Sequence, residues 1–121
     1  MKILHLITRL ILGGAQENTL LSCEGQAAAG HEVTLAFGPI YGPEGSLLER
    51  AQGGGYELAE LSAMIRAVRP WTDVRCYYQV RKLIRELKPD VVHTHSSKAG
   101  IIGRAAAWAE GVPAVVHTIH G

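Results

Sequence analysis

The stretch that most constrains the fold is Pro89–Gly100, with the sequence PDVVHTHSSKAG. Its two valines are β-branched and follow a Pro-Asp turn signal, which predicts a short buried strand over Val91–Thr94. Ser96 and Ser97 are good N-cap residues, so we expect a helix to begin at one of them and to run to about Glu110. A strand that leads directly into a helix is the repeating unit of parallel α/β sheets.

Strand and helix signals alternate along the rest of the chain in the same way. The predicted strands are Lys2–Thr8, Glu32–Phe37, Tyr56–Leu61, Val91–Thr94 and Ala114–Ile119. The predicted helices before the one at Ser96 are Ala15–Ala29, Glu44–Gln52 and Asp73–Leu87. This alternation predicts an α/β, Rossmann-like parallel sheet of about five strands in the order 3-2-1-4-5, with helices on both faces.

Two of the predicted helices carry clear signals for their faces and ends. In the first helix, we expect Leu20 and Leu21 to face the core and Gly30 to end the helix. Asp73–Leu87 is the most amphipathic segment of the chain. Its apolar residues recur at helical spacing, at Val74, Tyr77, Val80, Ile84 and Leu87. We expect an irregular segment before it, because Pro70 interrupts helices.

Length and composition predict one globular domain with a core of its own. The chain has 121 residues, of which 47% are hydrophobic and 19% charged. A formal net charge of +1 gives no field that would recruit nucleic acid, so no nucleic-acid partner is expected. Cys23 and Cys76 lack metal-ligand spacing, and we expect reduced thiols in a cytoplasmic protein. The apolar run Ile3–Leu12 is too short to span a bilayer and no cleavage site follows it, which favours a buried first strand.

The end of the fourth strand gathers polar side chains. His93 and His95 are two residues apart, so they point to the same side of the strand. The helix start at Ser96 and Ser97 offers free amide groups to an anion, and Lys98 lies beside them. The carboxyl end of a parallel strand is where an open α/β sheet usually binds its ligands.

Residues distant in sequence are expected at the same edge of the sheet. Gly13 and Gly14 join the first strand to the first helix, where glycines let a backbone approach a phosphate or a sugar closely. A plain tight turn explains them equally well, because the dinucleotide fingerprint G-x-G-x-x-G is absent. His120 follows the fifth strand, which we expect to be buried. We therefore expect Gly13-Gly14, His95–Lys98 and His120 to line one cleft.

Histidines at strand ends also raise the question of a metal site. His93 and His95 could ligate a metal ion together with His117 or His120 on the fifth strand. A metal site needs further ligands, however, and no carboxylate ends a strand here. No metal is therefore expected, and a hydrogen-bonded structural role or substrate contact is the preferred interpretation.

The segment Arg66–Lys88 is locally basic. It holds seven Lys and Arg residues against Asp73 and Glu86, a net of +5, with Trp71 and Tyr78 among them. Such a surface fits peripheral contact with the anionic headgroups of a membrane. A solvated basic helix face is an equally good interpretation.

Three motifs in this order resemble the family-four glycosyltransferases. They are LGGAQE at residues 12–17, KPDVVHTHSSKAGIIGR at residues 88–104 and GVPAVVHTIHG at residues 111–121. The resemblance implies a GT-B enzyme, in which two Rossmann-like domains face each other across a cleft. Residues 1–121 would be the N-terminal, acceptor-side domain. Such enzymes are retaining and usually metal-independent, and they use a nucleotide-sugar donor with a glycan, lipid-linked or small-molecule acceptor.

The resemblance also implies roles for individual residues. His120 matches the histidine that contacts the donor sugar, which makes it the candidate catalytic residue. Gly13 and Gly14 would lie near the donor phosphates. The acceptor side would be bordered by His95, Ser96, Ser97 and Lys98. No cofactor is implied beyond the donor substrate. The cytoplasmic location expected from the reduced thiols would be peripheral, at the inner face of the membrane, if Arg66–Lys88 binds lipid.

The family's C-terminal, donor-binding domain has no counterpart in these residues. That domain carries the nucleotide pocket, a basic pair for the diphosphate and a Glu-x7-Glu motif. The chain is therefore expected to be a truncated piece, inactive alone, because the leaving diphosphate needs electrostatic stabilisation. Two other functions stay open: a metal-dependent hydrolase that uses His93, His95 and His120, and a non-catalytic α/β binding module.

Overall fold

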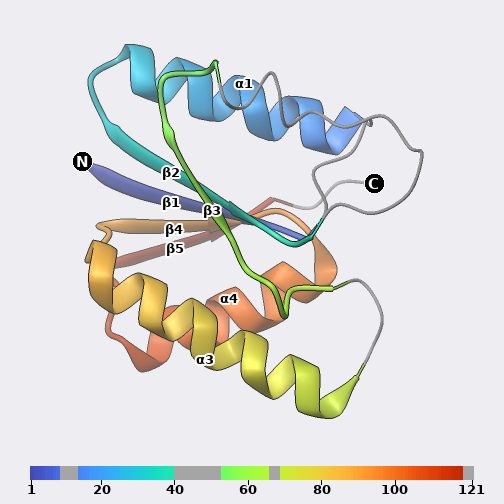
Figure 1. Cartoon of the computed structure of the whole chain (residues 1–121). Helices are drawn as coiled ribbons and strands as arrows, with labels where there is room; N and C mark the ends of the chain where they lie inside the picture. The colour runs from blue at the N-terminus through green and yellow to red at the C-terminus, as the bar shows by residue number, and fades with distance from the viewer. Residues whose placement is uncertain (9–13, 40–52, 66–68, 119–121) are drawn as a thin grey trace.

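The protein is built on one parallel sheet. The computed structural model describes residues 1–8, 14–39, 53–65 and 69–118. The strands are β1 (Lys2–Ile7), β2 (Glu32–Phe37), β3 (Glu57–Glu60), β4 (Val91–Thr94) and β5 (Ala114–His117). They are ordered β3-β2-β1-β4-β5, and each neighbouring pair is parallel (Figure 1). The predicted strand order is confirmed.

Helices cover both faces of the sheet, as predicted. Helix α1 (Gly14–Ala28) lies on one face, and α3 (Pro70–Leu87) and α4 (Ser97–Ala109) lie side by side on the other (Figure 1). The predicted helix Glu44–Gln52 falls outside the described residues. Among the described residues, no helix is both long and apolar enough to cross a membrane.

Helix α1 ends as predicted but faces the core differently. Gly30 has φ 93°, and its N–H donates to Ala27 O while the N–H of His31 donates to Gln26 O. This bonding closes the helix with a left-handed glycine. Leu20 is fully buried, whereas the prediction for Leu21 is wrong, because its side chain is 56% exposed. Successive helical residues are rotated by about 100°, so adjacent leucines cannot both face one sheet.

Helix α3 begins earlier than predicted. The expectation that Pro70 interrupts helical structure is wrong, because Pro70 is the first residue of the helix. Proline fits there, since the first helical N–H has no partner within the helix in any case. The buried side is formed by Cys76, Val80 and Ile84, and Val74 is 50% exposed instead of facing the core.

The core is divided by the sheet into two layers. Between the sheet and α3 and α4 lie, among others, Leu4, Leu6, Val80, Ile84, Val92 and Ile102. Between the sheet and α1 lie Ile7, Leu20, Val33, Leu35 and Phe37. The free thiols of Cys23 and Cys76 lie in different layers, so they cannot form a disulfide with each other.

Strand β5 is shorter and more exposed than the sequence predicts. It ends at His117, and Val115 and Val116 are 39% and 46% exposed. The expectation of a buried strand is therefore wrong. The cause is its position at the edge of the sheet, where one side has no neighbouring strand among the described residues.

Candidate functional site

The carboxyl ends of β1 and β4 are joined by hydrogen bonds that continue beyond the strands. The N–H of His95 donates to Leu6 O at 3.0 Å. The Ser96 Oγ accepts from the N–H of Thr8 at 3.2 Å and lies 2.7 Å from Thr8 Oγ1. Ser96 is the N-cap residue of α4, as expected, but its hydroxyl makes no bond to the helix. The Ser96 hydroxyl instead holds the backbone of Thr8, the residue directly after β1.

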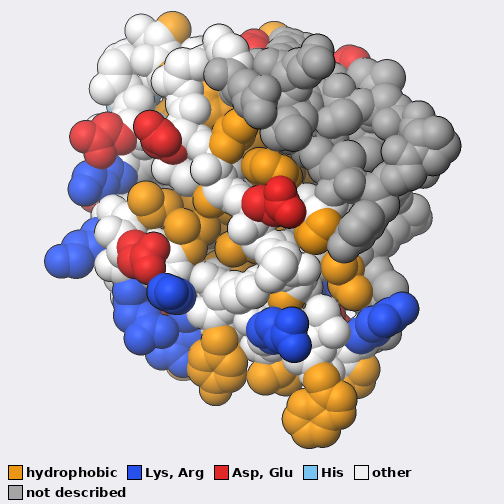
Figure 2. Space-filling view, viewed as in Figure 1, with side chains coloured by type: hydrophobic (Ala, Val, Ile, Leu, Met, Phe, Trp, Pro, Cys, Tyr) orange, Lys and Arg blue, Asp and Glu red, His pale blue; other side chains and the backbone are white. Residues whose placement is uncertain are grey.

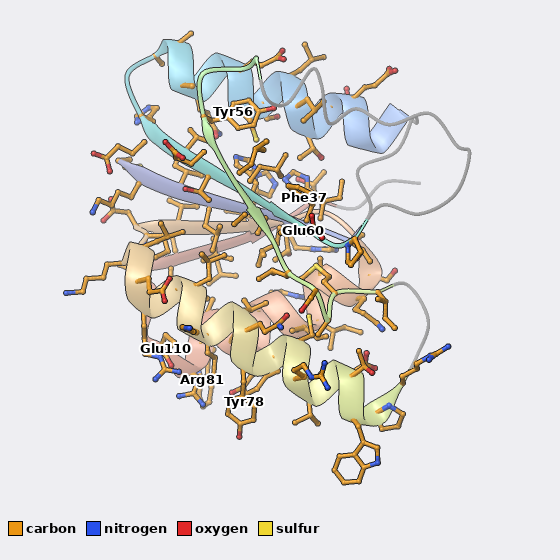
Figure 3. The ribbon with its side chains drawn as sticks, viewed as in Figure 1. Phe37, Tyr56, Glu60, Tyr78, Arg81 and Glu110 are labelled. Atoms are coloured by element: carbon orange, nitrogen blue, oxygen red, sulfur yellow. The ribbon has the colours of Figure 1, made fainter. Side chains whose placement is uncertain are left out.

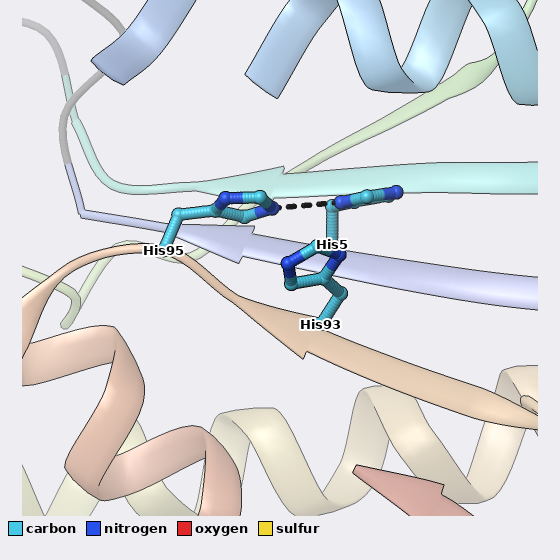
Figure 4. A group of neighbouring side chains, drawn as sticks. All are labelled: His5, His93 and His95. Atoms are coloured by element: carbon cyan, nitrogen blue, oxygen red, sulfur yellow. Dashed lines mark hydrogen bonds between the residues drawn. The ribbon is translucent and has the colours of Figure 1, made fainter. Parts of the chain in front are cut away.

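Three histidines stack on the α1 side of these two strands. His5 of β1 is the register partner of His93 of β4, and His95 follows two residues later. The ring centroids of His93 and His95 are 4.1 Å apart, and the His5 ring lies 5.0 Å and 5.1 Å from them (Figure 4). The predicted common orientation of His93 and His95 is confirmed. His5 was missed, although strand order and alternation along β1 together contain the signal for it.

Hydrogen bonds tie the stacked rings to their surroundings. Nδ1 of His5 is 2.8 Å from Nε2 of His95, and Nε2 of His5 is 2.7 Å from Oε1 of Gln26 on α1. Nε2 of His93 bonds to Oγ1 of Thr118 at 2.5 Å. His5 has no solvent exposure, and burial lowers its pKa below the ordinary value while the bond to Gln26 raises it by less. His5 is therefore a neutral imidazole at neutral pH.

This cluster differs from the metal site considered from the sequence. One nitrogen of each of His5, His93 and His95 lies within 4.8 Å of those of the other two. However, Nδ1 of His5 and Nε2 of His95 point directly at each other at a hydrogen-bond distance of 2.8 Å, which leaves no room for a metal ion between them (Figure 4). A proton already joins His5 and His95. His117 lies on the other face, where its Nδ1 is 2.7 Å from Thr94 Oγ1, so it cannot join this cluster.

Lys98 and Ser97 occupy the first turn of α4. The Lys98 Nζ lies 2.6 Å from Oδ1 of Asp73 on α3, and the lysine side chain is only 11% exposed. Ser97 is exposed. The lysine ammonium therefore links the first turns of two neighbouring helices, and its assignment to the acceptor side stays a prediction.

Of the remaining predicted site residues, Gly13, Gly14 and His120, the structure describes Gly14 alone. Gly14 is the first residue of α1, whose N-terminus follows the end of β1. Gly13 and His120 fall outside the described residues. The structure thus brings His95 and Ser96 together with the end of β1, whereas the predicted cleft as a whole stays a prediction.

The basic segment is partly neutralised by ion pairs. Arg81 and Arg85 both approach Glu110, at 2.7 Å and 3.5 Å, and the Arg81 pair joins α3 to the end of α4 (Figure 3). Trp71 and Tyr78 of α3 are 87% and 56% exposed. Figure 2 shows large apolar side chains along this lower edge of the molecule, with Lys and Arg side chains beside them.

Comparison with known proteins gives a family match over most of the chain. Residues 13–121 match the family model described as the glycosyl transferase 4-like domain. The chain is also 55% identical over 49 residues to the UDP-Gal:alpha-D-GlcNAc-diphosphoundecaprenol alpha-1,3-galactosyltransferase of Escherichia coli. That match covers 40% of this chain and 13% of the E. coli protein.

Two solved glycosyltransferase structures share the fold. HepE (Alr3699) of Anabaena, solved with UDP and glucose, has a TM-score of 0.71 at 16% identity, over 98% of this chain and 30% of its own. MurG of Acinetobacter baumannii has a TM-score of 0.73 at 16% identity, over 99% of this chain and 36% of its own. The chain thus spans about a third of either protein. The fold is that of the N-terminal half of a GT-B glycosyltransferase, and the chain belongs to the glycosyl transferase 4-like domain family.

Proposed function

We propose that this chain is the acceptor-side domain of an enzyme that transfers a sugar from a nucleotide-sugar donor to a hydroxyl group, with retention of configuration. The observation that carries this proposal is the family match over residues 13–121, together with the sheet order β3-β2-β1-β4-β5. In this fold, ligands bind outside the carboxyl ends of the strands. At those ends, His95 hydrogen-bonds to His5 of β1, and Ser96 hydrogen-bonds to Thr8, the residue that follows β1.

The proposed acceptor is a sugar carried on a lipid diphosphate, as in cell-envelope polysaccharide synthesis. The support comes from the E. coli relative, whose name states transfer from UDP-Gal to an acceptor on diphosphoundecaprenol. His120 would contact the donor sugar and Gly13 and Gly14 the region of its phosphates, while Ser97, Lys98 and the two residues before them would border the acceptor. Because the Lys98 ammonium is paired with Asp73, an acceptor would have to compete with that carboxylate for the ammonium group.

A second domain is proposed to supply the donor site, so this chain alone should be inactive. Transfer at an anomeric carbon requires stabilisation of the leaving diphosphate. No cofactor or metal is proposed to take part. The direct test is transfer of labelled sugar, from a panel of nucleotide-sugars to lipid-linked acceptors, by the whole protein and by residues 1–121. We expect the whole protein to transfer the sugar even in the presence of EDTA, and residues 1–121 to transfer none. The anomeric configuration of the sugar in the product should match that in the donor. An inverted product would refute retention, and no transfer with any donor would refute the activity.

We also propose that the protein is cytoplasmic and that helix α3 contacts the anionic inner face of the membrane. Trp71, Val74 and Tyr78 are all exposed and recur at spacings of three and four residues, which puts them on one face of α3. Arg75 and Lys82 extend the same face at the same spacing. Exposed aromatic residues beside cations suit the interface between headgroups and water.

The membrane contact can be tested with vesicles. The chain should sediment with phosphatidylglycerol vesicles and not with phosphatidylcholine vesicles. Replacing Trp71 and Tyr78 together by Ala should weaken this binding by roughly tenfold or more, because two interfacial anchors are lost. Leu21→Ala is the control, since Leu21 is as exposed as Tyr78 but lies on α1, across the sheet. Equal binding by the control and the double variant would refute the contact.

A further inference from the structure

The end of β5 is attached to β4 by side chains as well as by the backbone. On the α4 face of the sheet, Nδ1 of His117 lies 2.7 Å from Oγ1 of Thr94. On the α1 face, Nε2 of His93 bonds to Oγ1 of Thr118, the residue directly after β5. The two strands thus exchange one histidine–threonine pair on each face of the sheet.

A repeated sequence and a one-residue offset produce these crossed pairs. Residues 91–94 and 115–118 both read Val-Val-His-Thr. In the parallel register, however, Thr94 is opposite His117, so the two repeats are shifted by one residue. Side chains alternate between the faces of a sheet along each strand, so the shift puts the histidine of either repeat beside the threonine of the other. Without it, like residues would lie opposite each other.

Strand β5 depends on such contacts because of its place in the sheet. It has four residues, and β4 is its one neighbour among the described residues. Backbone bonds hold it at both ends, where the N–H of Ala114 donates to Asp90 O and the N–H of Thr118 donates to Thr94 O. The ends of a short edge strand open most readily, so the side-chain pairs hold β5 where fraying begins.

Helix α4 leaves a space for the ring of His117. A Cβ added at Gly100 would lie 2.5 Å from Cε1 and 2.9 Å from Nδ1 of His117. The ring therefore lies directly against the α4 backbone while it bonds to Thr94. The glycine is what allows the ring to reach that threonine.

We propose that the two histidine–threonine pairs are positioning residues, which fix the end of β5 and through it the backbone of His120. His120 follows Thr118 by two residues. Two residues span at most about 7 Å, so the position of Thr118 sets narrow limits on that of His120. A misplacement of about 1 Å at a reacting centre can lower a rate about a hundredfold. The catalytic part of this proposal rests on the proposed function, in which His120 contacts the donor sugar.

Amide hydrogen exchange in this chain tests the structural part without any substrate. Thr118→Val removes the hydroxyl and keeps a branched side chain that suits a strand. The protection factor of the N–H at residue 118 should fall at least tenfold, while that of Ala114, at the other end of β5, stays unchanged. Thr118→Ser, which restores the hydroxyl, should restore the protection. Equal protection of residue 118 in the wild type and in Thr118→Val would overturn the proposal.

Gly100→Ala tests the other pair without changing either of its members. Its Cβ should push the His117 ring away from Thr94, so the same loss of protection at residue 118 is expected. The matched control is Gly25→Ala, whose Cβ would meet no atom within 4 Å. Thr94→Val, which removes the hydroxyl alone, gives the same expectation if Gly100→Ala does not fold. Unchanged protection in a folded variant of this pair would refute its role.

Kinetics of the whole enzyme test whether the pairs act through His120. Thr118→Val should lower kcat/KM at least tenfold at an unchanged Tm, and Thr118→Ser should restore it. In the His120→Ala background, Thr118→Val should have no further effect, because the group that it positions is already gone. The same tenfold loss in that background, or a lower Tm with unchanged kcat/KM, would contradict positioning of His120. If the protein transferred no sugar at all, the proposed function would fail, while the exchange data would still decide whether the pairs fix β5.

Discussion

At the scale of single residues, the unexposed ring of His5 makes stability depend on pH in the acid range. Its pKa is lowered from the ordinary value of 6.5, so below that pH the unfolded chain binds a proton that the folded chain does not. We predict that the free energy of unfolding falls below about pH 6.5, with a contribution from this residue of up to about 1.4 kcal/mol per pH unit.

Urea unfolding between pH 5 and 8 measures this dependence. His5→Phe cannot titrate at this position, so its unfolding free energy should decline less steeply with acid than that of the wild type. His31→Phe, which leaves His5 in place, should keep the steep decline. Identical slopes for the wild type and His5→Phe would count against a buried neutral His5.

The two buried thiols should make the free energy of unfolding depend on pH in the alkaline range as well, where it should fall as the pH rises. Burial raises the pKa of Cys23 to about 12 and that of Cys76 to about 11, from an ordinary value of 9.0. Above pH 9 the unfolded thiols ionise while the folded ones stay protonated, so stability should fall with rising pH up to the folded pKa values.

At pH 8, both thiols should resist an uncharged alkylating reagent in the native state and react in urea. Rapid native labelling would be inconsistent with their burial.

At the scale of elements, α4 packs closely on the sheet through glycine. A Cβ added at Gly103 would lie 2.7 Å from side-chain carbons of both Leu6 and Thr94. We predict that Gly103→Ala destabilises the fold by about 1–3 kcal/mol, because overpacking outweighs the better helix propensity of alanine. Gly25→Ala on α1 is the matched control, since its Cβ would meet no atom within 4 Å. It should stabilise by roughly 0.5–1 kcal/mol. Thermal melts that rank the two variants in the reverse order would contradict this packing.

The sequence was most informative about elements and least informative about side-chain partners. Strand order follows from the alternation of strand and helix, and β2 and β4 have their predicted bounds. Partners depend on tertiary contacts that local patterns do not contain. Ser96 stands at the expected cap position, yet its hydroxyl bonds to Thr8, 88 residues away. Lys98 likewise pairs with Asp73 on another helix, although the local motif pointed to an anion.

At the scale of the whole molecule, the two edges of the sheet have different roles in this account. The carboxyl edge holds the hydrogen bonds between β1 and β4, the histidine cluster and the N-termini of α1 and α4. The amino edge holds the glycine turn before β2 and the ion pairs of Glu110. We therefore expect substitutions at the carboxyl edge to change sugar transfer, and substitutions at the amino edge to change stability alone.

The most direct test of this claim compares one histidine at each edge in the whole enzyme. His120 follows β5 in the sequence and is proposed to contact the donor sugar, whereas His31 directly precedes β2, at the amino edge of the sheet. Once a donor and acceptor are known, kcat/KM should fall by roughly ten- to a hundred-fold in His120→Ala, which corresponds to loss of one buried hydrogen bond of about 1–3 kcal/mol. The same constant should be unchanged in His31→Ala, with both variants melting cooperatively. Equal kcat/KM in the two variants would contradict a functional site at the carboxyl edge of the sheet.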